Sequence, residues 1–309
     1  MAPPPRPTHH FTIDVEEYFQ VVALEHVVRR SWWGRMGSRV EREMDVLLEL
    51  LDAASARATC FTLGWIAEHR PELVRRLSAA GHEIASHGWD HVRVTHQSPA
   101  EFRRSVRESK AVLEDLTGLP VLGFRAPSFS IVPGLEWALD ILLEEGYRYD
   151  SSLFPIRRPD GYGYEGAGRD PHQLERPSGS LIEFPLTTLR IGRLNLPAAG
   201  GGYFRLLPYA LVRAGFRSCE RRGMPGTFYV HPWEIDAEQP RLPVSTLTRL
   251  RHYGGLAGTR ARLERLLREF RFRPIVDTLR EIDLRGAHSP AMTLPSTLVA
   301  ASSTAGVGA

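Results

Sequence analysis

Short β-prone segments alternate with helical segments along most of this 309-residue chain. The first pair comprises residues 10–15, where polar and apolar residues alternate, and residues 39–56, where Val40, Met44 and Leu47 recur at helical spacing. Further strands are predicted at residues 58–63, 82–86, 121–124, 147–150, 181–185 and 227–231. Further helices are predicted at residues 71–80, 99–116, 135–145, 208–222, 263–270 and 275–282. Strands that alternate with helices in this way predict a parallel α/β fold.

The overall composition excludes several classes of protein. Hydrophobic residues make up 42% and charged residues 24%, as in an ordinary globular protein. Lys and Arg (39) barely exceed Asp and Glu (36) and are scattered, whereas a nucleic-acid-binding protein would concentrate them on one stripe. Cys60 and Cys219 lie among apolar residues, which favours buried free thiols. No apolar window approaches a membrane span and no secretory signal is visible, so a cytoplasmic location is expected.

Two terminal segments and one internal segment depart from the alternating pattern. Residues 1–9 are rich in proline and are expected to be disordered, as are residues 286–309, which are small and polar. Residues 154–176 are rich in Gly, Pro, Tyr and Arg. Because so long a loop is uncommon unless it is functional or disordered, we interpret it as an insertion on the substrate side.

Polar residues typical of active sites lie at the ends of the predicted strands. They are Asp14, His87, Arg125, Asp150 and His231. In a (β/α) barrel the carboxyl ends of the strands form the catalytic face. The pattern therefore predicts one site at that face.

His87 and His91 are four residues apart directly after a predicted strand. On a helical turn this spacing would place both imidazoles on one face, within reach of one metal ion. Two histidines at this spacing also occur often by chance, so the position at the end of a buried strand is what favours a metal site.

Asp14 and Glu16 alternate along an extended segment and should therefore face the same side. One carboxylate could bind a metal while the other serves as a base; the alternative is a pair of solvated loop residues. Arg125 could clamp a carboxylate by paired hydrogen bonds, or form only a surface salt bridge. His231 could be a general acid or a core histidine with a hydrogen-bond partner.

These segments, in this order, resemble the motifs of the polysaccharide deacetylase family, also called carbohydrate esterase family 4 or NodB-homology enzymes. The matching motifs are the Asp14 strand end, His87-x-x-x-His91, Arg125-x-Pro127 and the late strand that ends in His231. The motif Asp-Val-Glu-Glu-Tyr-Phe at residues 14–19 and the motif His-Pro-Trp-Glu at residues 231–234 are similar to those of the exosortase-associated exopolysaccharide subgroup of this family. The resemblance implies a distorted (β/α) barrel over residues 10–231 with a C-terminal extension, residues 232–285, packed on it.

The resemblance also implies a role for each matching residue. Asp14 would be the general base, His231 the general acid and Arg125 the residue that orients Asp14. Metal ligands would be Glu16, His87 and His91, holding Zn²⁺ or, by geometry, Co²⁺, Ni²⁺ or Mn²⁺. Asp150 is a candidate acidic partner for His231. Substrate contacts are expected from Pro127, Ser128, Trp233 and Tyr162.

The expected function is metal-dependent removal of N-acetyl groups from a polysaccharide or oligosaccharide, in exopolysaccharide biosynthesis. The aromatic, glycine-rich insertion around Tyr162 favours a saccharide, because sugars stack on rings. One alternative is an allantoinase-like amidohydrolase of a small cyclic ureide, which the Gly88 after the first metal histidine favours. Another is a saccharide-binding homologue without catalytic activity.

Overall fold

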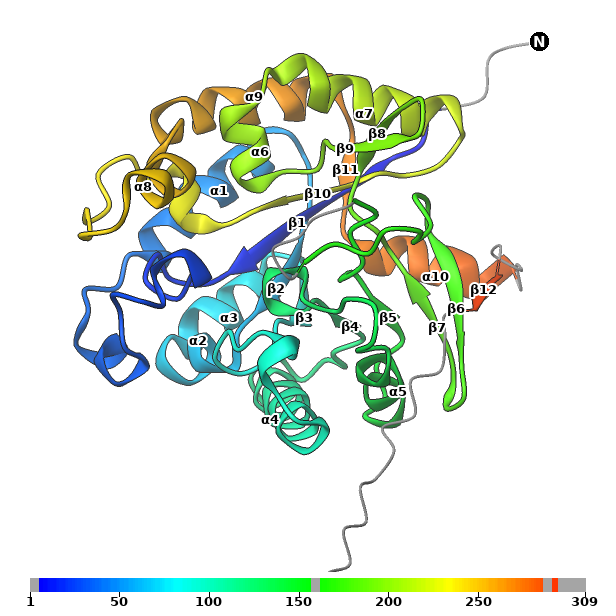
Figure 1. The fold of residues 1–309 in the computed structure, drawn as a ribbon, viewed down its shortest axis with the longest axis horizontal. Coiled ribbons are helices and arrows are strands. Elements are labelled where there is room, and N and C mark those ends of the chain that lie inside the picture. The colour runs from blue at the N-terminus through cyan, green and yellow to red at the C-terminus, as the bar shows by residue number, and fades with distance from the viewer. Residues whose placement is uncertain (1–5, 157–161, 286–290, 294–309) are drawn as a thin grey trace, which may run out of the picture.

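The computed structural model describes residues 6–156, 162–285 and 291–293. Its main feature is a ten-stranded sheet with the order β10-β1-β2-β3-β4-β5-β7-β6-β12, in which β11 also pairs with β1 (Figure 1). Every pairing is parallel except that of β6 with β7. The strands of this sheet are β1 (His9–Val15), β2 (Thr59–Thr62), β3 (Glu83–Ser86), β4 (Gly123–Phe124), β5 (Tyr149–Asp150), β6 (His172–Arg176), β7 (Gly179–Glu183), β10 (Thr227–Val230), β11 (Phe272–Arg273) and β12 (Ala291–Thr293).

The chain just beyond β7 closes the sheet into a distorted barrel. Leu186 forms an isolated parallel bridge with Thr227 of β10, and the Thr187 amide donates to the Thr227 carbonyl at 3.2 Å. Strands β1, β2, β3, β4, β5, β7 and β10 thus run in one direction around a common interior. The predicted parallel α/β barrel is confirmed.

Helices surround the barrel, as Figure 1 shows. They are α1 (Val40–Ala53), α2 (Gly64–His69), α3 (Pro71–Ala79), α4 (Pro99–Thr117), α5 (Trp137–Glu144), α6 (Gly201–Leu206), α7 (Tyr209–Arg221), α8 (Thr246–Tyr253), α9 (Thr259–Glu269) and α10 (Ile275–Arg285). The sequence predicted seven of these and missed α2, α6 and α8. Among the described residues, no helix is both long and apolar enough to cross a membrane.

Local sequence explains where α4 begins and ends. The Ser98 hydroxyl accepts from the Glu101 amide while the Glu101 carboxylate accepts from the Ser98 amide, which is a complete capping box. Gly118 ends the helix in the left-handed conformation (φ 66°), which costs glycine little free energy.

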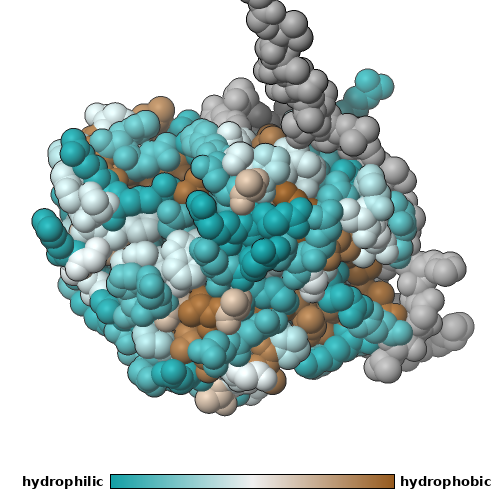
Figure 2. All heavy atoms as spheres, turned by 90° about the horizontal axis from the view of Figure 1, so that it is seen from below, coloured by the Kyte–Doolittle hydropathy of each residue, from teal (hydrophilic) through white to brown (hydrophobic). Residues whose placement is uncertain are grey.

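Figure 2 shows the molecule from the end where α4 and α5 lie, with a mostly hydrophilic surface and separate apolar areas.

The C-terminal helix α10 packs against residues of the barrel strands. Its Ile275 and Leu279 belong to one buried cluster with Phe61, Tyr149 and Phe184. Polar contacts reinforce this packing, since His10 Nε2 lies 2.8 Å from the Thr278 hydroxyl and the Val276 amide donates to Glu83 at 3.0 Å. Helix α10 is therefore part of the barrel's core.

We expect Leu279→Ala to lower the free energy of unfolding by about 2–5 kcal/mol, the usual cost of deleting a buried leucine side chain. Leu279 is only 2% exposed. Chemical denaturation should reveal the loss, whereas Leu250→Ala, at a position 60% exposed, should change stability by less than about 0.5 kcal/mol. Equal effects of the two substitutions would show that α10 contributes little to the core.

Three segments differ from the sequence-based expectation. The predicted disordered N-terminus includes His9, but His9 is buried and pairs with Phe272 as the first residue of β1. Within the predicted tail, Ala291–Thr293 pairs in parallel with β6, so the prediction of a disordered tail is wrong for these three residues. The predicted insertion contains β6, which forms a hairpin with β7, and a second hairpin follows at β8 (Thr188–Ile191) and β9 (Leu194–Pro197). Residues 1–5, 157–161, 286–290 and 294–309 of these predictions lie outside the described residues.

Candidate metal and catalytic centre

Alternation along β1 brings a column of polar side chains to the barrel interior. Thr12 and Asp14 lie on the strand and Glu16 follows it directly, and all three side chains are buried. Asp14 Oδ2 and Glu16 Oε1 lie 3.8 and 3.7 Å from Nε2 of His231, which follows the neighbouring strand β10. The prediction that Asp14 and Glu16 share one side is confirmed.

Glu16, His87 and His91 form a compact set of metal-ligand side chains. Each offers one ligand atom, and these atoms all lie within 4.8 Å of one another. Glu16 Oε2 lies 2.9 Å from His91 Nε2, and all three residues are buried. The predicted helical turn between the histidines is wrong, because Gly88 (φ 76°) and His91 (φ 58°) bend the chain into a non-helical loop that still brings the imidazoles together.

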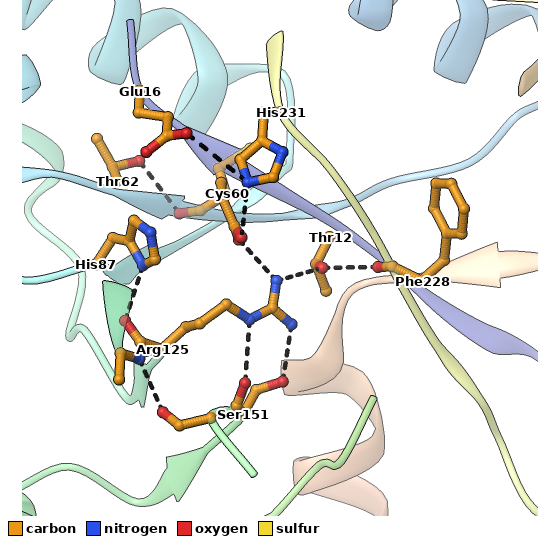
Figure 3. Close-up of polar contacts among 12 residues, drawn as sticks. Thr12, Glu16, Cys60, Thr62, His87, Arg125, Ser151, Phe228 and His231 are labelled. Atoms are coloured by element: carbon orange, nitrogen blue, oxygen red, sulfur yellow. Dashed lines mark hydrogen bonds and ion pairs between the residues drawn. The ribbon is translucent and has the colours of Figure 1, made fainter. Parts of the chain in front are cut away.

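Hydrogen bonds with neighbouring groups orient His87 and Glu16 so that each can bind a cation. His87 Nδ1 donates to the Arg125 carbonyl at 2.8 Å, which leaves Nε2 as the free acceptor (Figure 3). The Trp233 indole donates to Glu16 Oε1 at 3.0 Å. Such outer hydrogen bonds are typical of metal sites. The residues present therefore fit a divalent cation with two imidazole and one carboxylate ligands.

The charge states of these groups also suit a cation. Burial raises the pKa of Glu16, but the charges of His91 and His231 outweigh it and lower the pKa to about 2. Burial lowers the pKa of His87 to about 4, against the opposing charge of Asp14. At neutral pH Glu16 is thus an anion and His87 a neutral imidazole, the forms that bind metals.

We expect the purified protein to hold about one divalent metal per chain, since three converging ligands suffice. The double variant His87→Ala/His91→Ala should lose it. Elemental analysis after removal of loosely bound metal measures both. Equal metal content in the two proteins would place the bound metal elsewhere.

Arg125 is fully buried and joins three elements of the barrel. Its guanidinium donates to Asp14 Oδ1 at 2.7 Å, to the Thr12 hydroxyl at 2.6 Å, and to the hydroxyl (2.8 Å) and carbonyl (3.1 Å) of Ser151. It also lies over the Phe61 ring, 4.1 Å from the centroid. The alternative of a surface salt bridge is therefore wrong. Arg125 grips Asp14 through one nitrogen only and uses its other donors to fix its own position.

His231 is oriented by Glu234, three residues further along the chain. Its Nδ1 lies 2.6 Å from Glu234 Oε1, and Glu234 Oε2 accepts from Arg205 Nε at 2.6 Å. Burial lowers the pKa of His231, but the charges of Glu16, Glu234 and Asp14 outweigh it and raise the pKa to about 9. His231 is thus protonated at neutral pH, with Nε2 directed at the two carboxylates of β1.

Asp150 is not the acidic partner of His231. Its carboxylate accepts from the hydroxyl (2.6 Å) and amide (3.1 Å) of Ser152 at the end of β5. Burial raises the pKa of Asp150. Neither Glu234 nor Arg205 was predicted from the sequence. The motif His-Pro-Trp-Glu does contain a signal for Glu234, because a residue three positions after His231 can face back across a turn.

The residues expected to contact substrate lie in different environments. Trp233 is only 5% exposed, and its indole nitrogen donates to Glu16. It therefore positions a proposed metal-ligand residue rather than offering a face on which a sugar could stack. Pro127 is buried, and Ser128 is half-buried with a left-handed backbone (φ 56°). Tyr162 is half-buried, and its hydroxyl lies 2.6 Å from that of Tyr203.

Comparison with known proteins gives two family matches. Residues 38–142 match the polysaccharide deacetylase model, and residues 151–280 match a domain of unknown function, DUF3473. The peptidoglycan-N-acetylglucosamine deacetylase PgdA of Listeria monocytogenes is 25% identical over 153 residues, which cover 47% of this chain and 32% of that protein. A peptidoglycan deacetylase of Helicobacter pylori is 30% identical over 109 residues, 35% of this chain and 36% of the relative.

Residues 38–142 thus form a polysaccharide deacetylase region, which confirms the family resemblance predicted from the motifs. The chain spans about a third of the length of the curated relatives it matches. A Mycobacterium smegmatis structure described as a polysaccharide deacetylase has a TM-score of 0.64 at 20% identity, covering 96% of this chain and 97% of that one. The allantoinase PuuE has a TM-score of 0.55 at 18% identity, covering 92% and 95%. These likenesses show that the fold of those two structures extends over nearly the whole chain.

The second matched segment begins at residue 151, well before the end of β10. It therefore includes β10 and the residues that orient His231. Residues after 231 contribute β11 beside β1 and α10 against the barrel strands. The domain boundary at residue 231 stays a prediction.

Proposed function

We propose that this protein is a metal-dependent N-deacetylase of N-acetylated saccharides. The observation that carries the proposal is that the buried residues Glu16, His87, His91 and Asp14 lie together with the half-buried His231. Three protein ligands leave a coordination position open, as in catalytic rather than structural zinc sites. Two imidazoles and one carboxylate suit Zn²⁺, and Co²⁺, Ni²⁺ or Mn²⁺ are compatible with the same ligands.

Asp14 is the general base in this proposal. Its carboxylate is held by Arg125 at 2.7 Å and lies beside the ligand set, where it can accept a proton from an attacking water. When bound, the cation supplies Lewis acidity to water and to the acetamide carbonyl. Arg125 keeps the Asp14 carboxylate in a fixed direction, because its four hydrogen bonds leave the guanidinium no freedom to turn.

His231 is the general acid. Cleavage of the C–N bond requires a proton on the departing amine, and His231 carries one on Nε2 at neutral pH. Glu234 accepts from Nδ1 and so fixes the orientation of the ring. The proton on Nε2 passes to the amine, and the products are acetate and a free amino sugar.

The names of the relatives support a saccharide substrate. They include peptidoglycan-N-acetylglucosamine deacetylases and a chitooligosaccharide deacetylase of Bradyrhizobium, 37% identical over 60 residues, which cover 19% of this chain and 27% of that protein. We infer that this chain acts on N-acetylhexosamine units, and the early and late motifs favour a role in exopolysaccharide biosynthesis.

Acetate release from N-acetylated oligosaccharides tests the proposal. We expect equal amounts of acetate and free amine, loss of both on chelation, and recovery on adding Zn²⁺. A cyclic ureide such as allantoin should not be consumed. Consumption of allantoin without acetate release would favour the small-amide alternative, and binding of oligosaccharide without any turnover would favour a non-catalytic homologue.

A further inference from the structure

A hollow of about 390 Å³ adjoins the candidate metal site. Its walls come from two segments, residues 19–33 and residues 91–96, and each begins at or near a proposed metal ligand. His91 belongs to both the ligand set and the wall. The volume lies within the range of small-molecule sites, roughly 300–1,000 Å³. A second hollow of about 260 Å³, lined by residues such as Gly81 and Pro274, contains none of the proposed catalytic or metal-binding residues.

The wall of this hollow is rich in cations. Arg29, Arg30 and Arg93 line it, and Glu25 is the one carboxylate among its lining residues. Glu25 lies 2.9 Å from Arg93, and Asp90, which is not a lining residue, lies 3.5 Å from Arg30. Arg29 lies over the Trp32 ring at 5.5 Å and has no ion pair within the described ranges. Positive charge therefore exceeds negative charge around the opening.

The same wall contains hydrogen-bond donors that have no acceptor. Gln20 Nε2, Trp33 Nε1 and Arg93 Nε are buried, and none has a hydrogen-bond partner among the described residues. Unsatisfied buried donors are unfavourable, and these three belong to residues that line the hollow. Carboxylate and phosphoryl oxygens are acceptors with the right charge, and they form planar paired contacts with guanidinium groups.

We propose that this hollow is a subsite for an anionic group of the saccharide substrate, either a carboxylate or a phosphoryl group. The inference rests on the proposed deacetylase function, because the hollow adjoins the proposed site through His91, one of the three metal-ligand residues. The substrate class is then an acidic N-acetylated saccharide rather than a neutral one.

Three matched substrates test the subsite. They are N-acetylchitotriose, the same trimer oxidised to a carboxylate at its reducing end, and the trimer with a phosphate at that end. With zinc-loaded full-length protein, we expect kcat/KM to be higher for at least one anionic trimer than for the neutral one. The preferred anionic trimer identifies the source of the charge, and added salt should reduce the preference.

Variants distinguish an effect of the arginines that line the hollow from a general effect of positive charge on the protein surface. In Arg93→Gln, and independently in the exposed Arg29→Gln, the ratio of kcat/KM for the preferred anionic trimer to that for the neutral trimer should fall about 10-fold, mainly through KM. Arg35 is exposed, lies two residues beyond the first wall segment and does not line the hollow, so Arg35→Gln should keep the wild-type ratio. Equal kcat/KM for all three trimers, or an equal loss in Arg35→Gln, would overturn the proposal.

Calorimetric binding distinguishes failure of this inference from failure of the proposed function. If no trimer is deacetylated, the function is wrong, but tighter binding of an anionic trimer that weakens about 10-fold in Arg93→Gln or Arg29→Gln would still support the subsite. If the neutral trimer is deacetylated while the anionic trimers bind no better, the function stands and the subsite is wrong.

Discussion

Asp14→Asn should lower kcat by at least about 100-fold, the usual scale for loss of a general acid–base group. Asparagine has nearly the shape of aspartate and retains an oxygen that can accept the hydrogen bond from Arg125. It cannot take a proton from water near neutral pH. Because Asp14 is outside the set of converging ligand atoms, metal content should remain that of the wild type.

Acetate release and elemental analysis on the same preparation measure both effects. Asp115→Asn, the same change at an exposed position of α4, is the matched control and should leave both unchanged. If Asp14→Asn removed the metal instead, Asp14 would be a ligand and the assignment of Glu16 would have to be exchanged with it. Near-normal turnover would remove Asp14 from the mechanism.

Glu234→Gln should have the second-largest effect, with a fall in kcat of about 100-fold. Glu234 accepts from His231 Nδ1 at 2.6 Å, and its charge helps to raise the pKa of His231 to about 9. Glutamine keeps the size of the side chain but loses the charge, so the pKa of His231 falls. The protonated form then disappears at lower pH, and the alkaline limb of the kcat profile should shift to lower pH.

A pH series of kcat for wild type and Glu234→Gln measures this shift. The exposed Glu238→Gln provides a matched control, which should keep the wild-type profile. An alkaline limb that stays in place while kcat falls would show that Glu234 acts only through ring orientation. A limb that moves to higher pH would contradict the role of His231 as the acid.

Much of the fold was predictable because the signals for it are local. Periodicity located the seven barrel strands and most helices within a few residues, and Ser98 and Gly118 marked the ends of α4. The packing of α10 was not predictable, because Leu279 shares a buried cluster with Phe61, more than two hundred residues away in the chain. The periodicity of the helix does not reveal such a distant partner. Helix α2 lies between β2 and α3 and is only six residues long, too short for a clear period.

The candidate site likewise has features that local sequence predicts and features that it does not. Alternation along β1 correctly placed Asp14 beside Glu16, because a strand has a fixed period of two. The partner of His231 was missed because Asp150 also lies at a strand end. Only the turn after β10 shows that Glu234 reaches the imidazole. The conformation of the His87–His91 loop was also beyond the sequence, because His91 adopts a positive φ that non-glycine residues rarely take.

Titration of the metal-free protein with Zn²⁺, with the rate of acetate release measured at each addition, tests the central claim most directly. We predict that the rate from an N-acetylated oligosaccharide rises in proportion to added zinc and levels off at about one equivalent per chain, because one three-ligand site is responsible. The His87→Ala/His91→Ala protein should show no rise. A rate that is independent of zinc, or that rises equally in the double variant, would contradict a catalytic metal centre at Glu16, His87 and His91.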